Sequence, residues 1–152
     1  MPIQYWLMKS EPDVFSISDL KKNKTEEWDG VRNYQARNFM KTMKKNDIVL
    51  FYHSNAKPSG LAGLATIHKE ALPDSTQFNK KSKYYDAKST KENPRWHCVH
   101  VKYKKTFKEV IDLKTLKEDP KLSNMLVCQK GSRLSVQPVE KKDFDYIIKM
   151  YC

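Results

Sequence analysis

The sequence predicts a single α+β domain over residues 1–152, a small mixed β-barrel of about five or six strands with short helices packed around it. Three observations lead to this fold class. A length of 152 residues favours one core rather than two. Apolar runs of strand length recur along the chain, and short helical stripes separate them. Most of these runs are spaced for antiparallel pairing, and five or six strands can close on themselves around one core.

The first expected elements are a strand and a short helix. Residues 3–8 are apolar and aromatic and predict a strand, in which Trp6 is expected to face the core. Pro12 disfavours helix in the residue before it, so a loop follows the strand. Ser16 and Asp19 stand three residues apart, an acidic variant of the capping box, and predict a short helix there.

The stretch from Trp28 to Met40 predicts a corner between an extended segment and a helix. Trp28 ends the extended segment, Asp29-Gly30 is a turn dipeptide, and Asn33 is a suitable helix cap. The helix presents a core-facing stripe of apolar residues at positions i, i+3, i+4 and i+7, namely Ala36, Phe39, Met40 and Met43. Such corners often display ligand-binding groups, and the alternative is a well-packed corner with a buried tryptophan.

The next two elements are expected to form a hairpin. Residues 48–53 are a continuous apolar run, which predicts a central strand buried on both faces. Residues 61–67 predict the returning strand, after a loop rich in Asn, Pro, Ser and Gly. Gly63 inside the returning strand indicates a bulge or a close approach by another group.

Residues 71–94 are long, polar and nearly free of aliphatic side chains, which predicts a mobile basic insertion. From residue 80 to 95, six basic side chains oppose two acidic ones, and Tyr84 and Tyr85 lie among them. Basic residues with aromatics between them suit a surface that contacts phosphates and bases. A solvated loop whose aromatics hold it to the barrel is the equal alternative.

The last part of the chain predicts two strands and two helices. Residues 96–107 alternate as an amphipathic strand. Asp112 is expected to cap a helix that ends near Pro120, and residues 134–138 predict the last strand. The final helix carries Phe144, Ile147, Ile148 and Tyr151 at helical spacing.

Composition narrows the class of partner. The net charge is +11 and the isoelectric point about 9.5, which favours a polyanionic partner, nucleic acid first. Three scattered cysteines do not make a disulfide framework, and no apolar run has the length of a membrane span. We therefore expect a cytoplasmic protein, or a nuclear one in a eukaryote, without membrane contact. His97 and His100 face opposite sides of a strand, so neither a metal site nor a cofactor is expected.

Several separated motifs, in the right order, resemble the EVE domain family, which belongs with the PUA-like and YTH-like domains. The resemblance covers nearly the whole chain and is therefore specific. The motifs are Tyr5–Pro12, Phe15–Leu20, Trp28–Met40, Asp47–Ser54, Gly63–Ala65, Pro94–Trp96 and Arg133–Val139.

The resemblance implies a PUA-like barrel with a pocket for one nucleobase of DNA or RNA, a modified one such as methylated or hydroxymethylated cytosine. It also implies binding without catalysis. The pocket positions that carry over are Lys9, Ser10, Trp28, Gly30, Val31, Asn33, Tyr34, Tyr52, His53, Ser54, Trp96, Leu134 and Ser135. The expected phosphate contacts are Arg32, Arg37, Lys80, Lys81, Lys83, Arg95 and Arg133.

Each of these assignments has an alternative. Trp28 is a stacking wall or a core tryptophan, and Ser10 is a base contact or a capping hydroxyl. His53 lines the pocket or is a core histidine at a strand end. For the whole protein, the alternatives are an RNA-binding module or a protein adaptor without base selectivity. An enzyme acting on nucleic acid ranks lower, and would need Cys98 or Cys128 beside a histidine in a cleft.

Overall fold

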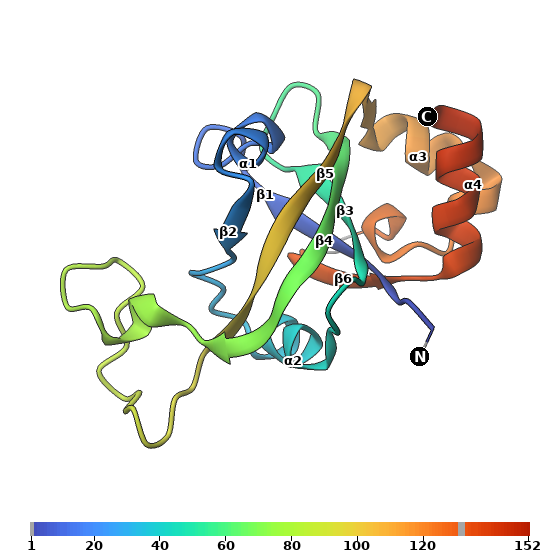
Figure 1. Cartoon of the computed structure of the whole chain (residues 1–152). Helices are drawn as coiled ribbons and strands as arrows, with labels where there is room; N and C mark the ends of the chain where they lie inside the picture. The colour runs from blue at the N-terminus through green and yellow to red at the C-terminus, as the bar shows by residue number, and fades with distance from the viewer. Residues whose placement is uncertain (1, 131–132) are drawn as a thin grey trace.

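The structure is a computed structural model that describes residues 2–130 and 133–152. Its described part forms one mixed sheet with four α-helices and three 3-10 turns around it (Figure 1). The strands are β1 (Tyr5–Ser10), β2 (Thr25–Glu27), β3 (Ile48–His53), β4 (Gly60–Pro73), β5 (His97–Asp112) and β6 (Val136–Val139). The helices are α1 (Ile17–Asn23), α2 (Tyr34–Thr42), α3 (Leu113–Glu118) and α4 (Lys141–Tyr151), and the 3-10 turns are η1 (Ser75–Phe78), η2 (Pro120–Leu122) and η3 (Leu126–Cys128).

The strand order in the six-stranded sheet is β2-β5-β4-β3-β1-β6. The β1–β3 pair is parallel, and the other four pairs are antiparallel. The strand β3 lies in the middle and is buried along Val49–Tyr52, as the apolar run predicts. The α+β class and the strand number expected from the sequence are therefore confirmed.

Four of the predicted strands have different bounds in the structure, including the last one, predicted over residues 134–138 and found at Val136–Val139. The pairing of β1 with β3 runs from Tyr5 to Ser10, so the first strand ends two residues later than expected. The strands β4 and β5 are longer than predicted because they pair with each other beyond their apolar parts. Polar residues at these ends are held by ladder hydrogen bonds, which an apolar pattern does not reveal.

The sheet is buried on both faces by two separate cores. The first core lies under α1 and α2 and includes Trp6, as expected, together with Phe51 and Met40. The second lies under α3 and α4 and includes Leu7 and Phe144. Figure 1 shows the two pairs of helices on different sides of the strands. The middle strands β1, β3 and β4 send alternate side chains into one core and then the other.

The helix caps and the strand glycine predicted from the sequence have the predicted roles in the structure. The capping box of α1 is present, because the Ser16 hydroxyl accepts from the Asp19 N–H and the Asp19 carboxylate accepts from the Ser16 N–H. The side-chain oxygen of Asn33 caps α2 by accepting the N–H of Ala36. At Gly63 the β3–β4 register shifts, and a Cβ there would lie 2.3 Å from the carbonyl oxygen of Lys105. The glycine therefore permits the close approach of β5.

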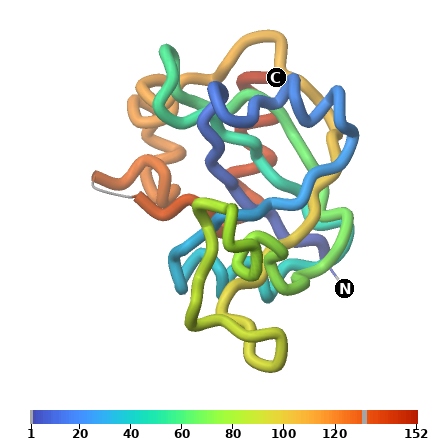
Figure 2. Tube along the Cα trace, turned by 90° about the vertical axis from the view of Figure 1, so that its left-hand side faces the viewer, coloured from blue at the N-terminus to red at the C-terminus, as the bar shows by residue number. Residues whose placement is uncertain are grey.

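The segment 79–96 projects from the far ends of β4 and β5, as Figures 1 and 2 show. The predicted insertion began at residue 71, but residues 71–73 belong to β4 and the next residues form η1. The buried Gln77 closes the base of the projection: its amide nitrogen donates to the carbonyl oxygens of Asp74 and Trp96, and its amide oxygen accepts from the Trp96 N–H. Both ends of the segment are thus attached to the sheet.

Candidate functional site

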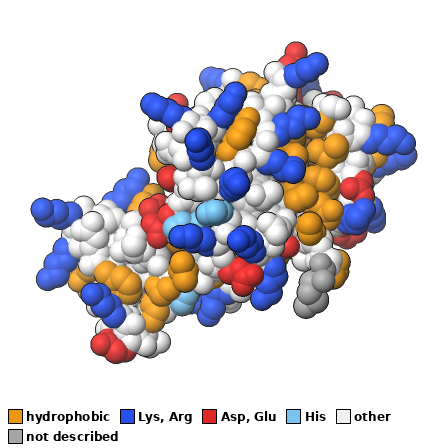
Figure 3. Space-filling model, in the orientation of Figure 1, with side chains coloured by type: hydrophobic (Ala, Val, Ile, Leu, Met, Phe, Trp, Pro, Cys, Tyr) orange, Lys and Arg blue, Asp and Glu red, His pale blue; other side chains and the backbone are white. Residues whose placement is uncertain are grey.

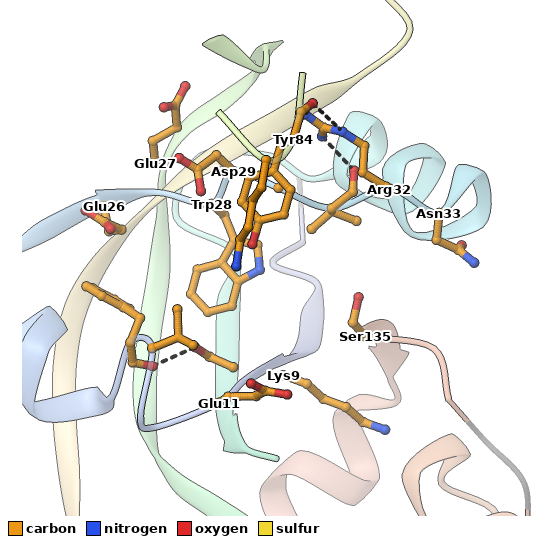
Figure 4. A pocket seen from close by; sticks show the side chains of 16 residues that line it. Lys9, Glu11, Glu26, Glu27, Trp28, Asp29, Arg32, Asn33, Tyr84 and Ser135 are labelled. Carbon is orange, nitrogen blue, oxygen red and sulfur yellow. Dashed lines mark hydrogen bonds between the residues drawn. The ribbon is translucent and has the colours of Figure 1, made fainter. Parts of the chain in front are cut away.

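A pocket of about 570 Å³ lies between the end of β2, the end of β1 and the projecting segment (Figure 4). Its walls come from four parts of the chain that are far apart in sequence. The lining residues are Lys9, Ser10, Glu11, Val14, Phe15, Glu26, Glu27, Trp28, Asp29, Gly30, Val31, Arg32, Asn33, Lys83, Tyr84 and Ser135. Of the residues predicted for a base pocket, the structure brings together Lys9, Ser10, Trp28, Gly30, Val31, Asn33 and Ser135.

Trp28 belongs to the pocket wall and to the core at the same time. Its backbone N–H donates to the carbonyl oxygen of Val99 at 2.9 Å, which fixes the residue just beyond β2. The indole is 8% exposed and meets the Phe51 ring edge-on, with 5.5 Å between ring centroids. The two readings of Trp28 are therefore not exclusive, because the same side chain packs on the first core and lines the pocket.

Gly30 turns the chain between this wall and α2. Its φ of +81° lies in the left-handed region, which side chains with a Cβ rarely adopt. Its N–H donates to the Asp74 carboxylate at 2.8 Å. A Cβ on Gly30 would lie 2.5 Å from Cζ of Tyr84, so the ring of Tyr84 rests against the glycine. Both the backbone conformation and the close ring require glycine here.

Arg32 is held by other parts of the protein, although it was predicted as a phosphate contact. All five guanidinium N–H groups have partners. Nε and Nη2 donate to the carbonyl oxygen of Tyr84, and the remaining bonds reach the carbonyl oxygen of Val31, the Asp74 carboxylate and the Thr76 hydroxyl. The structure therefore leaves no free guanidinium donor for a phosphate, and the assignment of Arg32 is corrected to one that holds the pocket wall.

Tyr34 and Trp96 were predicted for the pocket but lie beside it. Their rings are stacked, with centroids 4.8 Å apart and planes inclined by 17°. The Arg37 guanidinium lies 4.7 Å from the Tyr34 ring, and that of Arg32 lies 5.2 Å from the Trp96 ring. The Trp96 indole N–H donates to Asp86 in the projecting segment. These residues form a cation–π column that holds α2, the corner and the segment together.

The end of β3 does not open into the pocket as predicted. Alternation along the strand turns Tyr52 into the second core, where it is 3% exposed. Nε2 of His53 accepts the N–H of Ile17, which makes His53 a support for α1. The N–H of Ser54 donates to the carbonyl oxygen of Ser10. None of these three residues is among those that line the pocket.

Two further assignments are refined by the structure. Leu134 packs against the first core, next to the pocket residue Ser135, so it too is corrected to a packing position. Ser10 lines the pocket, and its hydroxyl also donates to the carbonyl oxygen of Phe15 at 2.6 Å. A base contact by Ser10 would have to use the remaining lone pairs of its oxygen.

Most of the other predicted phosphate contacts lie away from the pocket. Among them only Lys83 lines it, while Lys80, Lys81 and Arg133 are exposed elsewhere. Arg37 donates to the carbonyl oxygen of Arg95 and to Asn38. Lysine and arginine side chains are distributed over the whole face seen in Figure 3. The positive charge is therefore spread over the surface and is not concentrated in the pocket walls.

The walls themselves carry acidic side chains that the sequence did not single out. Glu11, Glu26, Glu27 and Asp29 line the pocket and outnumber its three basic residues. Burial, together with the charges of Asp29 and Glu27, raises the pKa of Glu26. Burial and the nearby Asp74 and Glu27 raise the pKa of Asp29. No spacing pattern in the sequence identifies these acidic residues as pocket residues, because they come together only where β2 turns toward the projecting segment.

His53 gives the molecule a testable response to acid. Burial lowers the pKa of His53, and its Nε2 can accept the N–H of Ile17 only in the neutral ring. A folded-state pKa below the unfolded value of about 6.5 contributes stability that is present above that pH and lost as the pH falls through the folded-state pKa.

We therefore expect a His53→Gln variant, which keeps an acceptor without titrating, to lose less stability than the wild type between about pH 7 and pH 5. Thermal unfolding followed by circular dichroism measures the difference. His97, whose pKa is also lowered by burial, is present in both proteins and cancels in the comparison. An identical loss in both proteins would show that His53 is not responsible.

The cysteines considered for an enzyme are poor nucleophiles in this structure. Cys98 is buried, and burial raises the pKa of its thiol. Burial likewise raises the pKa of Cys128. A thiol with a raised pKa holds little thiolate at neutral pH. Within residues 2–130 and 133–152, no group of three or more His, Cys, Asp or Glu side chains could hold a metal ion.

The helices that the structure describes are all too short or too polar to cross a membrane.

Known proteins resemble the chain over almost its full length. The model of the EVE domain matches residues 4–150. Thymocyte nuclear protein 1 of Homo sapiens is 43% identical over 165 residues, covering 96% of this chain and 73% of that protein. The crystal structure of human THYN1 protein in complex with 5-methylcytosine containing DNA has a TM-score of 0.90 at 44% identity and covers 96% of both chains. A crystal structure of a Pseudomonas syringae protein has a TM-score of 0.92 at 48% identity, covering 95% of this chain and 97% of that one.

Proposed function

The chain belongs to the EVE domain family, and from this premise we propose that it is a non-catalytic nucleic-acid-binding domain whose pocket accepts one modified cytosine. Its fold is the PUA-like one that the sequence implied. The observation that carries the proposal is the pocket beside Trp28, which has an aromatic wall and acidic lining in a chain of net charge +11. The DNA complex of the human relative supports the choice of ligand.

The charge of the walls favours a base over a phosphate. Four carboxylate side chains line the pocket against Lys9, Arg32 and Lys83, and Arg32 is already paired with Asp74. Phosphate would be repelled by this lining, whereas a nucleobase carries no charge at neutral pH. The basic surface outside the pocket attracts the phosphate backbone. A nucleotide swung out of its stack would therefore place its base inside and its phosphates outside.

The wall chemistry suits a base with an exocyclic amine, as cytosine has. Asp and Glu accept hydrogen bonds from the exocyclic amine of cytosine, and Glu26 and Asp29 supply such acceptors. Thymine has a carbonyl at the same position and would face these acids without a donor. Val14, Phe15 and Val31 give the pocket apolar surface against which a methyl group can pack. Burying one such carbon stabilises a complex by about 0.8 kcal/mol.

The test is a titration with two DNA oligonucleotides that differ only in one 5-methyl group. At one fixed salt concentration, we expect the methylated strand to bind about three- to tenfold more tightly, as followed by fluorescence anisotropy. A ribo-oligonucleotide of the same sequence shows whether the protein binds DNA or RNA more tightly. Equal affinity for the methylated and plain strands would refute modified-base recognition and leave only charge-driven binding.

A further inference from the structure

The ring of Tyr84 lines the base pocket although Tyr84 belongs to the projecting segment. Figure 4 shows its side chain reaching the hollow from a different element than Trp28. Three ring atoms, Cζ, Cε2 and Cε1, lie 2.5, 2.6 and 2.9 Å from where a Cβ of Gly30 would be. With three ring carbons at similar distances, the face of the ring covers Gly30. Tyr84 is thus part of the same wall region as the turn after Trp28.

Arg32 holds Tyr84 in position through the backbone carbonyl oxygen of Tyr84. Nε and Nη2 of Arg32 donate to the carbonyl oxygen of Tyr84 at 3.2 and 2.7 Å. The same guanidinium lies 5.5 Å from the centre of the Tyr84 ring. Arg32 is in turn fixed by Asp74, whose side chain is 1% exposed. A chain of contacts therefore runs from a buried carboxylate through Arg32 to the backbone and ring of Tyr84.

The pocket remains spacious with the Tyr84 ring inside its wall. Its volume of about 570 Å³ lies within the range of about 300–1,000 Å³ that is usual for small-ligand sites. The ring therefore bounds the pocket instead of filling it. A second aromatic surface, in addition to that of Trp28 and Phe15, gives a base another π-face to contact and excludes water from it.

We propose that Tyr84 is a specificity-determining residue that supplies the second aromatic wall of the base pocket, with Arg32 as its positioning residue. This inference rests on the proposed function, because it assigns a role within the same site. It gives the projecting segment a part in selecting the base, where the sequence suggested only phosphate contacts or a solvated loop. The aromatic lining comes from two parts of the molecule, Trp28 and Phe15 on the barrel and Tyr84 on the segment, so the pocket is complete only when the segment is docked.

Three variants test the assignment with the methylated and plain oligonucleotides at one salt concentration. Tyr84→Ala should weaken binding of the methylated strand about tenfold or more, because base–aromatic stacking is of that size. Tyr84→Phe keeps the ring and should stay within about twofold of the wild type. Tyr85→Ala is the matched control, since Tyr85 is on the same segment, 38% exposed, and does not line the pocket. It should also bind like the wild type.

The outcomes separate this inference from the proposed function. If the wild type does not prefer the methylated strand, the proposed function itself fails. If the wild type shows the preference and Tyr84→Ala keeps both affinity and preference, the wall assignment is wrong. If Tyr84→Phe binds the methylated strand as weakly as Tyr84→Ala, the hydroxyl of Tyr84 and not its ring contributes to binding. That result would also overturn the proposal. Circular dichroism of each variant confirms that the compared proteins are folded.

Discussion

Replacing Trp28 by alanine is expected to lower the free energy of unfolding by about 3–5 kcal/mol, because the indole is almost fully buried in the first core. Its edge-on contact with Phe51 is lost, whereas the backbone hydrogen bond to Val99 on β5 does not depend on the side chain. Urea unfolding followed by circular dichroism measures the effect through the midpoint at unchanged slope. A loss below about 1 kcal/mol would mean that the corner repacks around the missing ring.

The binding role of Trp28 requires a variant that stays folded. Trp28→Phe keeps an aromatic face and should retain the preference for the methylated strand, whereas Trp28→Leu removes the π-face and should lose about tenfold in affinity. Trp6→Phe is the control, because Trp6 is a buried tryptophan of the same core that does not line the pocket. It should reduce stability and leave the preference unchanged. A Trp28→Leu protein with full affinity would remove Trp28 from the binding site.

Asp74→Ala is expected to destabilise the protein by about 3–5 kcal/mol, the cost typical of breaking a buried ion pair from one side. The Asp74 carboxylate accepts from the N–H of Gly30, from Arg32, and from the N–H and hydroxyl of Thr76. Burial alone would raise the pKa of Asp74, but the hydrogen bonds from Thr76, Gly30 and Arg32 outweigh it and lower the pKa. Alanine leaves these donors without an acceptor.

A double-mutant cycle that combines Asp74→Ala with Arg32→Ala shows whether the loss of stability comes from the ion pair between the two side chains. Removing both side chains should cost less than the sum of the single changes, because no charge is then left unpaired. Lys141→Ala provides the control, since its ion pair with Asp145 is exposed on α4 and should leave the unfolding midpoint unchanged. Additive effects at positions 32 and 74 would contradict a coupled pair.

Local chemistry explains why much of the fold could be predicted. The capping groups Ser16, Asn33 and Asp112 act within three residues of themselves, so the sequence alone reveals them. The apolar run of β3 is buried on both faces because it lies in the middle of the sheet. The strand ends at residues 68–73 of β4 and 108–112 of β5 could not be predicted, because they depend on pairing between strands and do not continue the apolar pattern.

The residues of the candidate site also divide into those that local sequence predicts and those that depend on the fold. Lys9, Ser10 and the turn from Trp28 to Asn33 were found because each occupies a short, characteristic stretch. Tyr84 was noted as an aromatic among lysines, but its contact with Gly30 depends on the path of the whole projecting segment. Tyr52 was placed wrongly because the twofold alternation of β3 sends it to the other core. Motifs identify which segments meet, whereas geometry decides which side chains point inward.

The division of the interior into two cores has a consequence for how such proteins can diverge. Trp6 and Leu7 are sequence neighbours, yet the first supports the pocket side and the second supports α3 and α4. Substitutions under α3 and α4 change how firmly the barrel is held without reshaping the turn at Gly30. We therefore expect the binding site to tolerate substitutions under α3 and α4 more readily than substitutions around Gly30.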